Sequence, residues 1–126
     1  MENQLTCRVT ANWETGRIGA VTAEGIDPTI RFSSPPEFKG EPGFWTPEHF
    51  LVAAVASGFV VTLYALARAF ENGIREASAH GRRQTREAEG RLQFTEIVLQ
   101  PTLTIFQSQD RDRGYGLLER TEHEWP

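Results

Sequence analysis

The sequence predicts an α+β fold in which antiparallel strands pack around one long central helix. Residues 50–67 form the longest uncharged run in the chain, and segments before and after this run alternate between apolar and polar side chains. The uncharged run indicates a helix without a solvent face, and the alternation is typical of strands. The predicted order of strands and helices is typical of folds in which the helices pack against an antiparallel sheet. A chain of 126 residues fits one domain, which we expect to span residues 1–126.

Three short strands are expected before the long helix. Residues 5–13 alternate in polarity, which predicts a half-buried strand, and residues 17–23 and 28–32 predict two more. The loop over residues 33–43 contains prolines and glycines that disfavour regular structure. The apolar face of the first strand carries Leu5, Cys7, Val9, Ala11 and Trp13.

The boundaries of the long helix are well marked. Thr46 can act as the N-cap, Pro47 suits the first helical position, and Glu48 places a carboxylate in the first turn, where the helix dipole favours it. Asn72 and Gly73 provide the expected stop.

The uncharged middle of this helix predicts that another chain or a lipid layer covers it. A helix that is apolar on every side must be surrounded by protein or lipid. Small residues at Ala53, Ala54, Ser57 and Gly58 allow a second helix to approach closely, so we expect a homodimer. A membrane span is the alternative, because the run reaches the minimum length, but its alanine content and flanking charges disfavour it. A glycine inside a helix costs about 1 kcal/mol relative to alanine, so Gly58 needs a packing or functional reason.

A hairpin and a second helix are expected after the long helix. Residues 74–87 and 92–106 predict two strands joined by a tight turn at Glu89 and Gly90. The apolar positions of the second strand change phase, which predicts a bulge near Thr95 and Glu96. Pro101 indicates a bend or an edge. The closing helix is expected over residues 111–124, capped by Asp110 and weakened by Gly114 and Gly116.

Composition favours a soluble cytoplasmic protein. The net charge of −4 gives no electrostatic footprint for nucleic acid. No secretory signal is recognised at the N-terminus, and a single cysteine excludes an internal disulfide. The three histidines are dispersed, with no cluster at metal-ligand spacing, so neither a metal nor a cofactor is expected. Cys7 is expected to be a small buried hydrophobe.

Three segments carry a family resemblance. FKGEPGFWTPEHFLVAAVASGF, GRLQFTEIVLQPTLTI and LLERTEHEWP resemble the OsmC/Ohr family of thiol-dependent organic hydroperoxide reductases, especially its OsmC-like branch. The resemblance implies an intertwined homodimer with the long helix at its centre. It also implies an interface site built from two cysteines, an arginine and a glutamate. The chain is expected to lack the family's final strand.

The site residues that the resemblance implies can be placed one by one. The glutamate matches Glu48, and the arginine is best matched by Arg17 in the Gly-Arg-Ile-Gly turn. The first cysteine of the family lies ten residues after the glutamate, where this chain has Gly58, and the second position is occupied by Trp125. Without the resemblance, Glu48 and Arg17 would be interpreted as an ordinary first-turn carboxylate and a turn arginine.

The two replaced cysteines decide the expected function. In the family mechanism one thiolate attacks the peroxide and a second thiol resolves the sulfenic acid, and neither glycine nor tryptophan can do this. Peroxidase activity by this route is therefore expected to be absent. We expect instead that Arg17, Glu48 and Gly58 bind a small apolar or hydroperoxide-like ligand at the dimer interface, with the glycine enlarging the pocket. The alternatives are an altered or truncated form of an active reductase, and a peroxidase that uses Cys7.

Overall fold

The computed structural model describes residues 6–69, 74–88 and 91–125. These residues form two compact units, 1–50 and 51–126, and each is described by itself.

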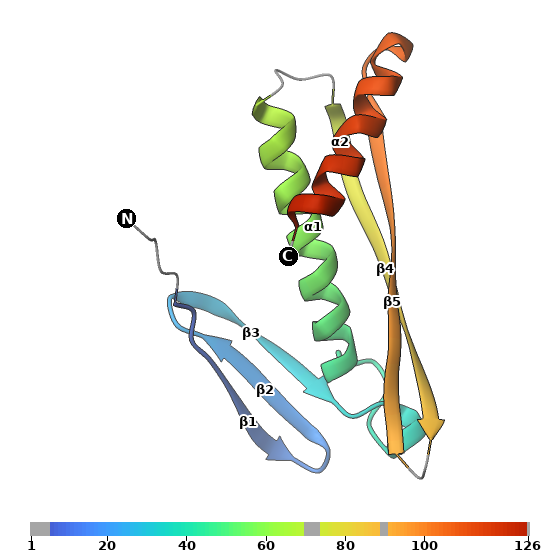
Figure 1. Cartoon of the computed structure of the whole chain (residues 1–126). Coiled ribbons are helices and arrows are strands. Elements are labelled where there is room, and N and C mark those ends of the chain that lie inside the picture. Colours follow the sequence, from blue (N-terminus) through green and yellow to red (C-terminus); the bar gives the residue numbers. More distant parts are fainter. Residues whose placement is uncertain (1–5, 70–73, 89–90, 126) are drawn as a thin grey trace. The chain divides into compact units, whose positions relative to one another are not determined.

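The first unit is a three-stranded antiparallel sheet (Figure 1). Its strands are β1 (Val9–Thr15), β2 (Ile18–Ala23) and β3 (Ile26–Ser33), in the order β1-β2-β3. The three strands predicted before the long helix are therefore present. The loop that follows β3 was predicted to lack regular structure. It contains one short 3-10 turn, η1 (Pro36–Phe38). A proline at the first position suits this turn since its fixed φ is already helical.

The predicted half-burial of the first strand is wrong within one chain. Every residue of β1 is exposed, and the side chain of Trp13 is 76% exposed. Cys7 lies ahead of β1 and is also exposed, so it is not the small buried hydrophobe that we expected. Alternation with a period of two identifies the residues that share a face, but it does not supply the layer that would cover them.

The long helix α1 (Pro47–Ala69) begins where the sequence predicts. The Thr46 hydroxyl accepts a hydrogen bond from the His49 backbone N–H at 3.2 Å, and the Thr46 backbone N–H donates to His49 Nδ1 at 3.0 Å. These two reciprocal bonds form a capping box in which histidine takes the place of the usual glutamate or glutamine. The predicted stop at Asn72 and Gly73 lies outside the described residues.

The second unit contains a long antiparallel hairpin and a closing helix (Figure 1). The hairpin strands are β4 (Ile74–Ala88) and β5 (Arg91–Ile105). Gln84 pairs with Glu96 and Thr85 pairs with Phe94, so Thr95 is left over and the predicted bulge is confirmed. Pro101 pairs with Ala79 in a sheet of two strands, each of which is an edge. The predicted turn at residues 89–90 lies outside the described part of the chain.

The closing helix α2 (Arg111–Glu124) follows a 3-10 turn, η2 (Ser108–Asp110). Asp110 occupies the N-cap position, but its side chain makes no capping hydrogen bond, so the predicted cap is wrong. The 3-10 turn carries the chain into the helix instead, with the Asp110 N–H bonded to the Gln107 carbonyl. Gly114 is buried, and a Cβ there would lie 3.3 Å from Leu103 Cδ2. This glycine therefore allows α2 to pack closely on β5.

Both helices bury apolar side chains against the hairpin. The core consists of Phe59, Leu63 and Ala67 from α1 together with Leu117 from α2. Around it pack the partly buried residues Leu66, Ala77, Ala79, Leu99, Leu103, Leu118 and Trp125. The second unit thus has a hydrophobic core of its own.

One face of α1 is left uncovered by the chain itself. Leu51, Val61 and Tyr64 are 44%, 68% and 63% exposed. Residues 47–68 are long and apolar enough to span a membrane by length and composition, with a mean hydropathy of 2.2 and only 17% of the most apolar window buried. A single chain therefore does not surround this helix as the sequence requires.

Candidate functional site

The two positions matched to the family's cysteines are neighbours in the structure. Gly58 lies in the middle of α1, and Trp125 is the residue that ends α2. A Cβ atom built on Gly58 would lie 3.1 Å from the indole Nε1 of Trp125 and 3.5 Å from its Cδ1. The chain therefore brings together two residues that the sequence places far apart.

The position of the Trp125 indole is fixed by packing and by the end of α2. Its ring meets the ring of Phe59 edge to face, with the centroids 5.5 Å apart and the planes at 78°. The Trp125 backbone N–H donates to the Thr121 carbonyl at 2.9 Å. Phe59 is only 5% exposed, so the indole rests on a buried aromatic surface.

The expected enlargement of the pocket at Gly58 is not found. The sequence predicts that glycine enlarges the pocket by removing a side chain. The space beside Gly58 is instead filled by Trp125, whose Nε1 is already at a tight contact distance for any added Cβ. A small residue on the helix and a large one at the end of α2 therefore compensate each other in volume.

Arg17 and Glu48 lie in the first unit, and no described interaction joins them. Arg17 is exposed in the turn between β1 and β2. Glu48 lies in the first turn of α1, and its Oε2 atom is buried with no hydrogen-bond partner. A buried carboxylate oxygen without a donor is costly, so Glu48 needs a donor beyond those that the described residues supply.

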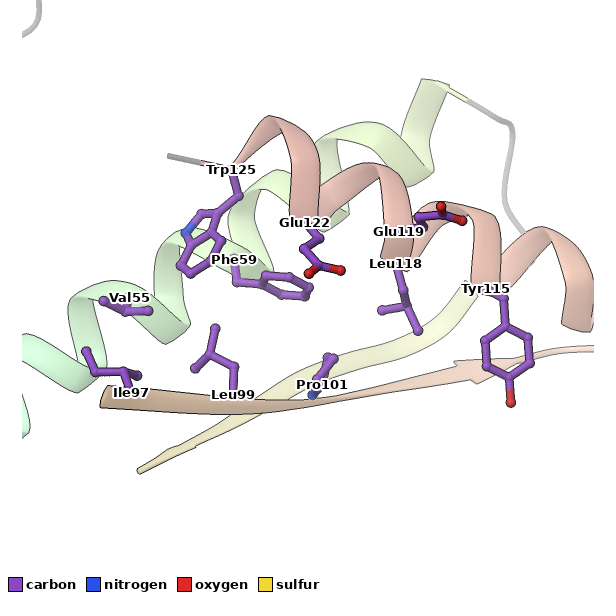
Figure 2. A pocket seen from close by; sticks show the side chains of 10 residues that line it. All are labelled: Val55, Phe59, Ile97, Leu99, Pro101, Tyr115, Leu118, Glu119, Glu122 and Trp125. Carbon is purple, nitrogen blue, oxygen red and sulfur yellow. The ribbon is translucent and has the colours of Figure 1, made fainter. Parts of the chain in front are cut away.

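A cavity of about 720 Å³ opens between α1, β5 and α2 (Figure 2). Its walls are mainly apolar, and two carboxylates and a phenol complete the lining. The lining residues are Val55, Phe59, Ile97, Leu99, Pro101, Tyr115, Leu118, Glu119, Glu122 and Trp125. A volume of this size is ordinary for a site that holds a small molecule. In the part of the chain that the structure describes, no group of three or more histidine, cysteine or carboxylate side chains is placed to hold a metal ion.

The sequence did not single out three residues near the start of α1 or in the cavity lining. His49 takes part in the cap of α1 and also contacts Trp45 edge to face, with centroids 5.9 Å apart. A histidine three residues after a threonine N-cap could have indicated this role. Glu119 and Glu122 line the cavity from α2, and their spacing of three residues places both on one side of a helix.

The comparisons with known proteins identify the fold. No family model matches the sequence, and neither does any curated protein sequence. Solved structures do match. An organic hydroperoxide resistance protein from Elizabethkingia anophelis superposes with a TM-score of 0.76 at 19% identity, covering 100% of this chain and 87% of that one.

Two further structures agree with this match. The organic hydroperoxide resistance protein OsmC from Legionella pneumophila has a TM-score of 0.75 at 18% identity, covering 99% of this chain and 88% of that one. An OsmC-like protein of unknown function from Vibrio cholerae has a TM-score of 0.75 at 14% identity, with 93% and 89% covered. The predicted α+β fold, with antiparallel strands and a long helix, is thereby confirmed, and the chain has the fold of OsmC/Ohr proteins.

Proposed function

We propose that this chain is an OsmC-like protein that does not reduce hydroperoxides by the thiol route and instead binds a small ligand. The observation that carries the proposal is the contact between Gly58 and Trp125, with 3.1 Å between the Cβ position of residue 58 and the indole Nε1. A pair of thiols that forms a disulfide must lie side by side. Here two adjacent positions on an OsmC/Ohr fold hold a glycine and a tryptophan.

The chemistry follows from these two side chains. Thiol-based reduction of a peroxide needs a thiolate that attacks the O–O bond and becomes a sulfenic acid, and a second thiol that condenses with it to a disulfide. Glycine has no atom to oxidise, and the indole of Trp125 cannot resolve a sulfenic acid. Arg17 and Glu48 can bind or orient a ligand, but neither side chain can act as the reductant of a peroxide.

The proposed ligand site is completed in a homodimer around α1. The exposed residues Leu51, Val61 and Tyr64 occur at intervals that place them on one side of α1, as a helix interface requires. The buried Glu48 oxygen has no donor among the described residues, and the proposed site supplies one from a ligand or from Arg17. In this proposal residues 1–126 act as one domain in a soluble cytoplasmic dimer that binds an apolar or hydroperoxide-like ligand at Arg17, Glu48 and Gly58.

A peroxidase assay tests the loss of the thiol route. The purified protein is mixed with cumene hydroperoxide and a dithiol reductant, and peroxide consumption is followed. We expect consumption no faster than in a control without protein. Turnover that requires this protein and depends on the dithiol would contradict the proposal.

The exposed Cys7 favours one alternative, in which the peroxidatic thiol lies outside the expected position. A solvent-accessible thiol can be oxidised by a peroxide, although Cys7 is not in a described ion pair that would stabilise its thiolate. A Cys7→Ser variant separates the two routes. If the wild-type protein consumes peroxide and Cys7→Ser does not, Cys7 is the reactive group.

The remaining alternative is an altered form of an active reductase. A Gly58→Cys, Trp125→Cys double variant restores two thiols at adjacent positions and removes the indole that crowds residue 58. Dithiol-dependent activity in this variant alone would show that the rest of the site is intact.

A further inference from the structure

The cavity between α1, β5 and α2 combines apolar walls with charge of a single sign. Among the described residues that line it, Glu119 and Glu122 are the only charged ones, and none is a lysine, arginine or histidine. No described hydrogen bond or ion pair engages either carboxylate, and both residues are exposed. The negative charge at the mouth is therefore available to a ligand.

Two arginines of α2 have described partners other than these carboxylates. Arg120 pairs with Glu124 at 3.1 Å, and the Arg111 guanidinium lies over the Tyr115 ring at 5.7 Å. No described ion pair joins Glu119 or Glu122 to a basic residue of the chain, which leaves both carboxylates open to a cationic ligand. Figure 2 shows the Glu122 side chain pointing from α2 toward the cavity.

The walls add a second requirement on the ligand. Phe59 and Trp125 present two aromatic rings held edge to face, and Leu99 and Leu118 provide aliphatic surface. Such walls favour an apolar or aromatic body, and the faces of aromatic rings also attract cations. A ligand that matches both features has a hydrophobic body with a positive charge at one end.

We propose that this cavity binds small hydrophobic amines. The apolar body of the amine packs between Phe59, Leu99 and Leu118, and its ammonium group lies at the mouth beside the carboxylates of Glu119 and Glu122. The lining shares Trp125 with the contact at Gly58 but contains none of Arg17, Glu48 and Gly58, so this inference does not rest on the ligand site of the proposed function.

Three probes that share one body test the charge preference. 4-(Biphenyl-4-yl)butylamine is cationic at neutral pH, the corresponding butanol is neutral, and the corresponding butanoate is anionic. Calorimetric titration of the full-length protein should show the amine binding about 3-fold to 10-fold more tightly than the alcohol, as expected for partly exposed ion pairs, and the butanoate binding most weakly. Equal affinities for the amine and the butanoate would overturn the proposal, as would no binding of any probe.

Charge-removing variants locate the preference in this cavity. A Glu119→Gln, Glu122→Gln double variant should bind the amine and the alcohol with affinities within about 2-fold of each other. The control, Glu37→Gln, removes an exposed carboxylate in η1 and should keep the full preference. If the double variant retains the preference, the ammonium binds elsewhere and the assignment is wrong.

An NMR measurement places the bound body of the amine. The indole N–H signal of Trp125 is identified by its loss in a Trp125→Phe variant. The amine should shift this signal in the wild-type protein and should shift the indole signals of Trp13 and Trp45 less. Binding that leaves the Trp125 signal unchanged would overturn the proposed location.

Discussion

The two units of the chain differ in how they are held together. The second unit buries Phe59, Leu63 and Leu117 in a shared core, with Leu63 fully inaccessible. In the described part of the first unit the only buried apolar side chain is Ala20, and large residues such as Trp13 and Ile26 are 76% and 61% exposed. The helices of the second unit thus share a core with its hairpin, whereas the strands of the first unit lack a core within one chain.

Backbone hydrogen bonds and surface pairs hold the sheet of the first unit. Arg31 pairs with Glu14 at 3.0 Å, and Arg8 pairs with Glu24 at 3.5 Å, but all four side chains are substantially exposed. Exposed ion pairs contribute about 0 to 1 kcal/mol each, which cannot replace a hydrophobic core. A three-stranded sheet needs a covered face to be stable, so within one chain the first unit has little hydrophobic stabilisation of its own.

Truncation of one apolar residue in each unit gives the largest expected effects and tests this difference directly. Leu63→Ala removes a fully buried side chain and should lower the free energy of unfolding by about 2 to 5 kcal/mol. Ile26→Ala, at a position 61% exposed, should lower it by less than about 0.5 kcal/mol. Urea unfolding followed by circular dichroism measures both. Equal losses would show that Ile26 is covered in solution as fully as Leu63.

A charge on the uncovered face of α1 tests the proposed dimer. Val61 is 68% exposed within one chain, so Val61→Glu should leave the chain folded but place a carboxylate in the helix interface. The dissociation constant of the dimer should rise at least about tenfold, or about 1.4 kcal/mol, because burying an unpaired charge is unfavourable. Light scattering after size exclusion should show a mass near 14.2 kDa for the variant and twice that for the wild type.

The matched control places the same charge on a different surface. Gln100→Glu adds a carboxylate at an exposed position of β5 and should leave the mass unchanged. A wild-type protein that is already monomeric at micromolar concentration would contradict the dimer. A wild-type protein recovered only with detergent would indicate that a membrane covers α1 instead.

The parts of the fold that the sequence predicted depend on local chemistry. Thr46 and Pro47 mark the start of α1 because capping involves only the residues of one turn. The bulge at Thr95 was predictable because a change of phase in the apolar residues has no other regular explanation in a strand. The exposure of Cys7 was not predictable in the same way, since burial depends on a covering layer that the strand itself does not specify.

The candidate site was also predictable only where local sequence determines it. The family resemblance placed Gly58 and Trp125 at matching positions, but it gave no reason for the indole to lie against the glycine. That contact depends on the crossing of α2 over α1 and on the ring of Phe59, both of which are long-range features. The pairing of Glu119 and Glu122 with an apolar cavity depends on the position of β5 in the same way.

The smallest expected effect concerns the contact between Gly58 and Trp125, and a double-mutant cycle measures it. Gly58→Ala should gain about 1 kcal/mol from helix propensity where space permits. In the wild-type background the new Cβ would lie 3.1 Å from the indole Nε1, so Trp125 must move and part of this gain is lost. In a Trp125→Ala background the gain should be complete, giving a coupling of about 0.5 to 1 kcal/mol between the two positions in urea unfolding. The same change in both backgrounds would mean that the indole does not rest on Gly58, and that the small residue at 58 does not compensate in volume for the large one at 125.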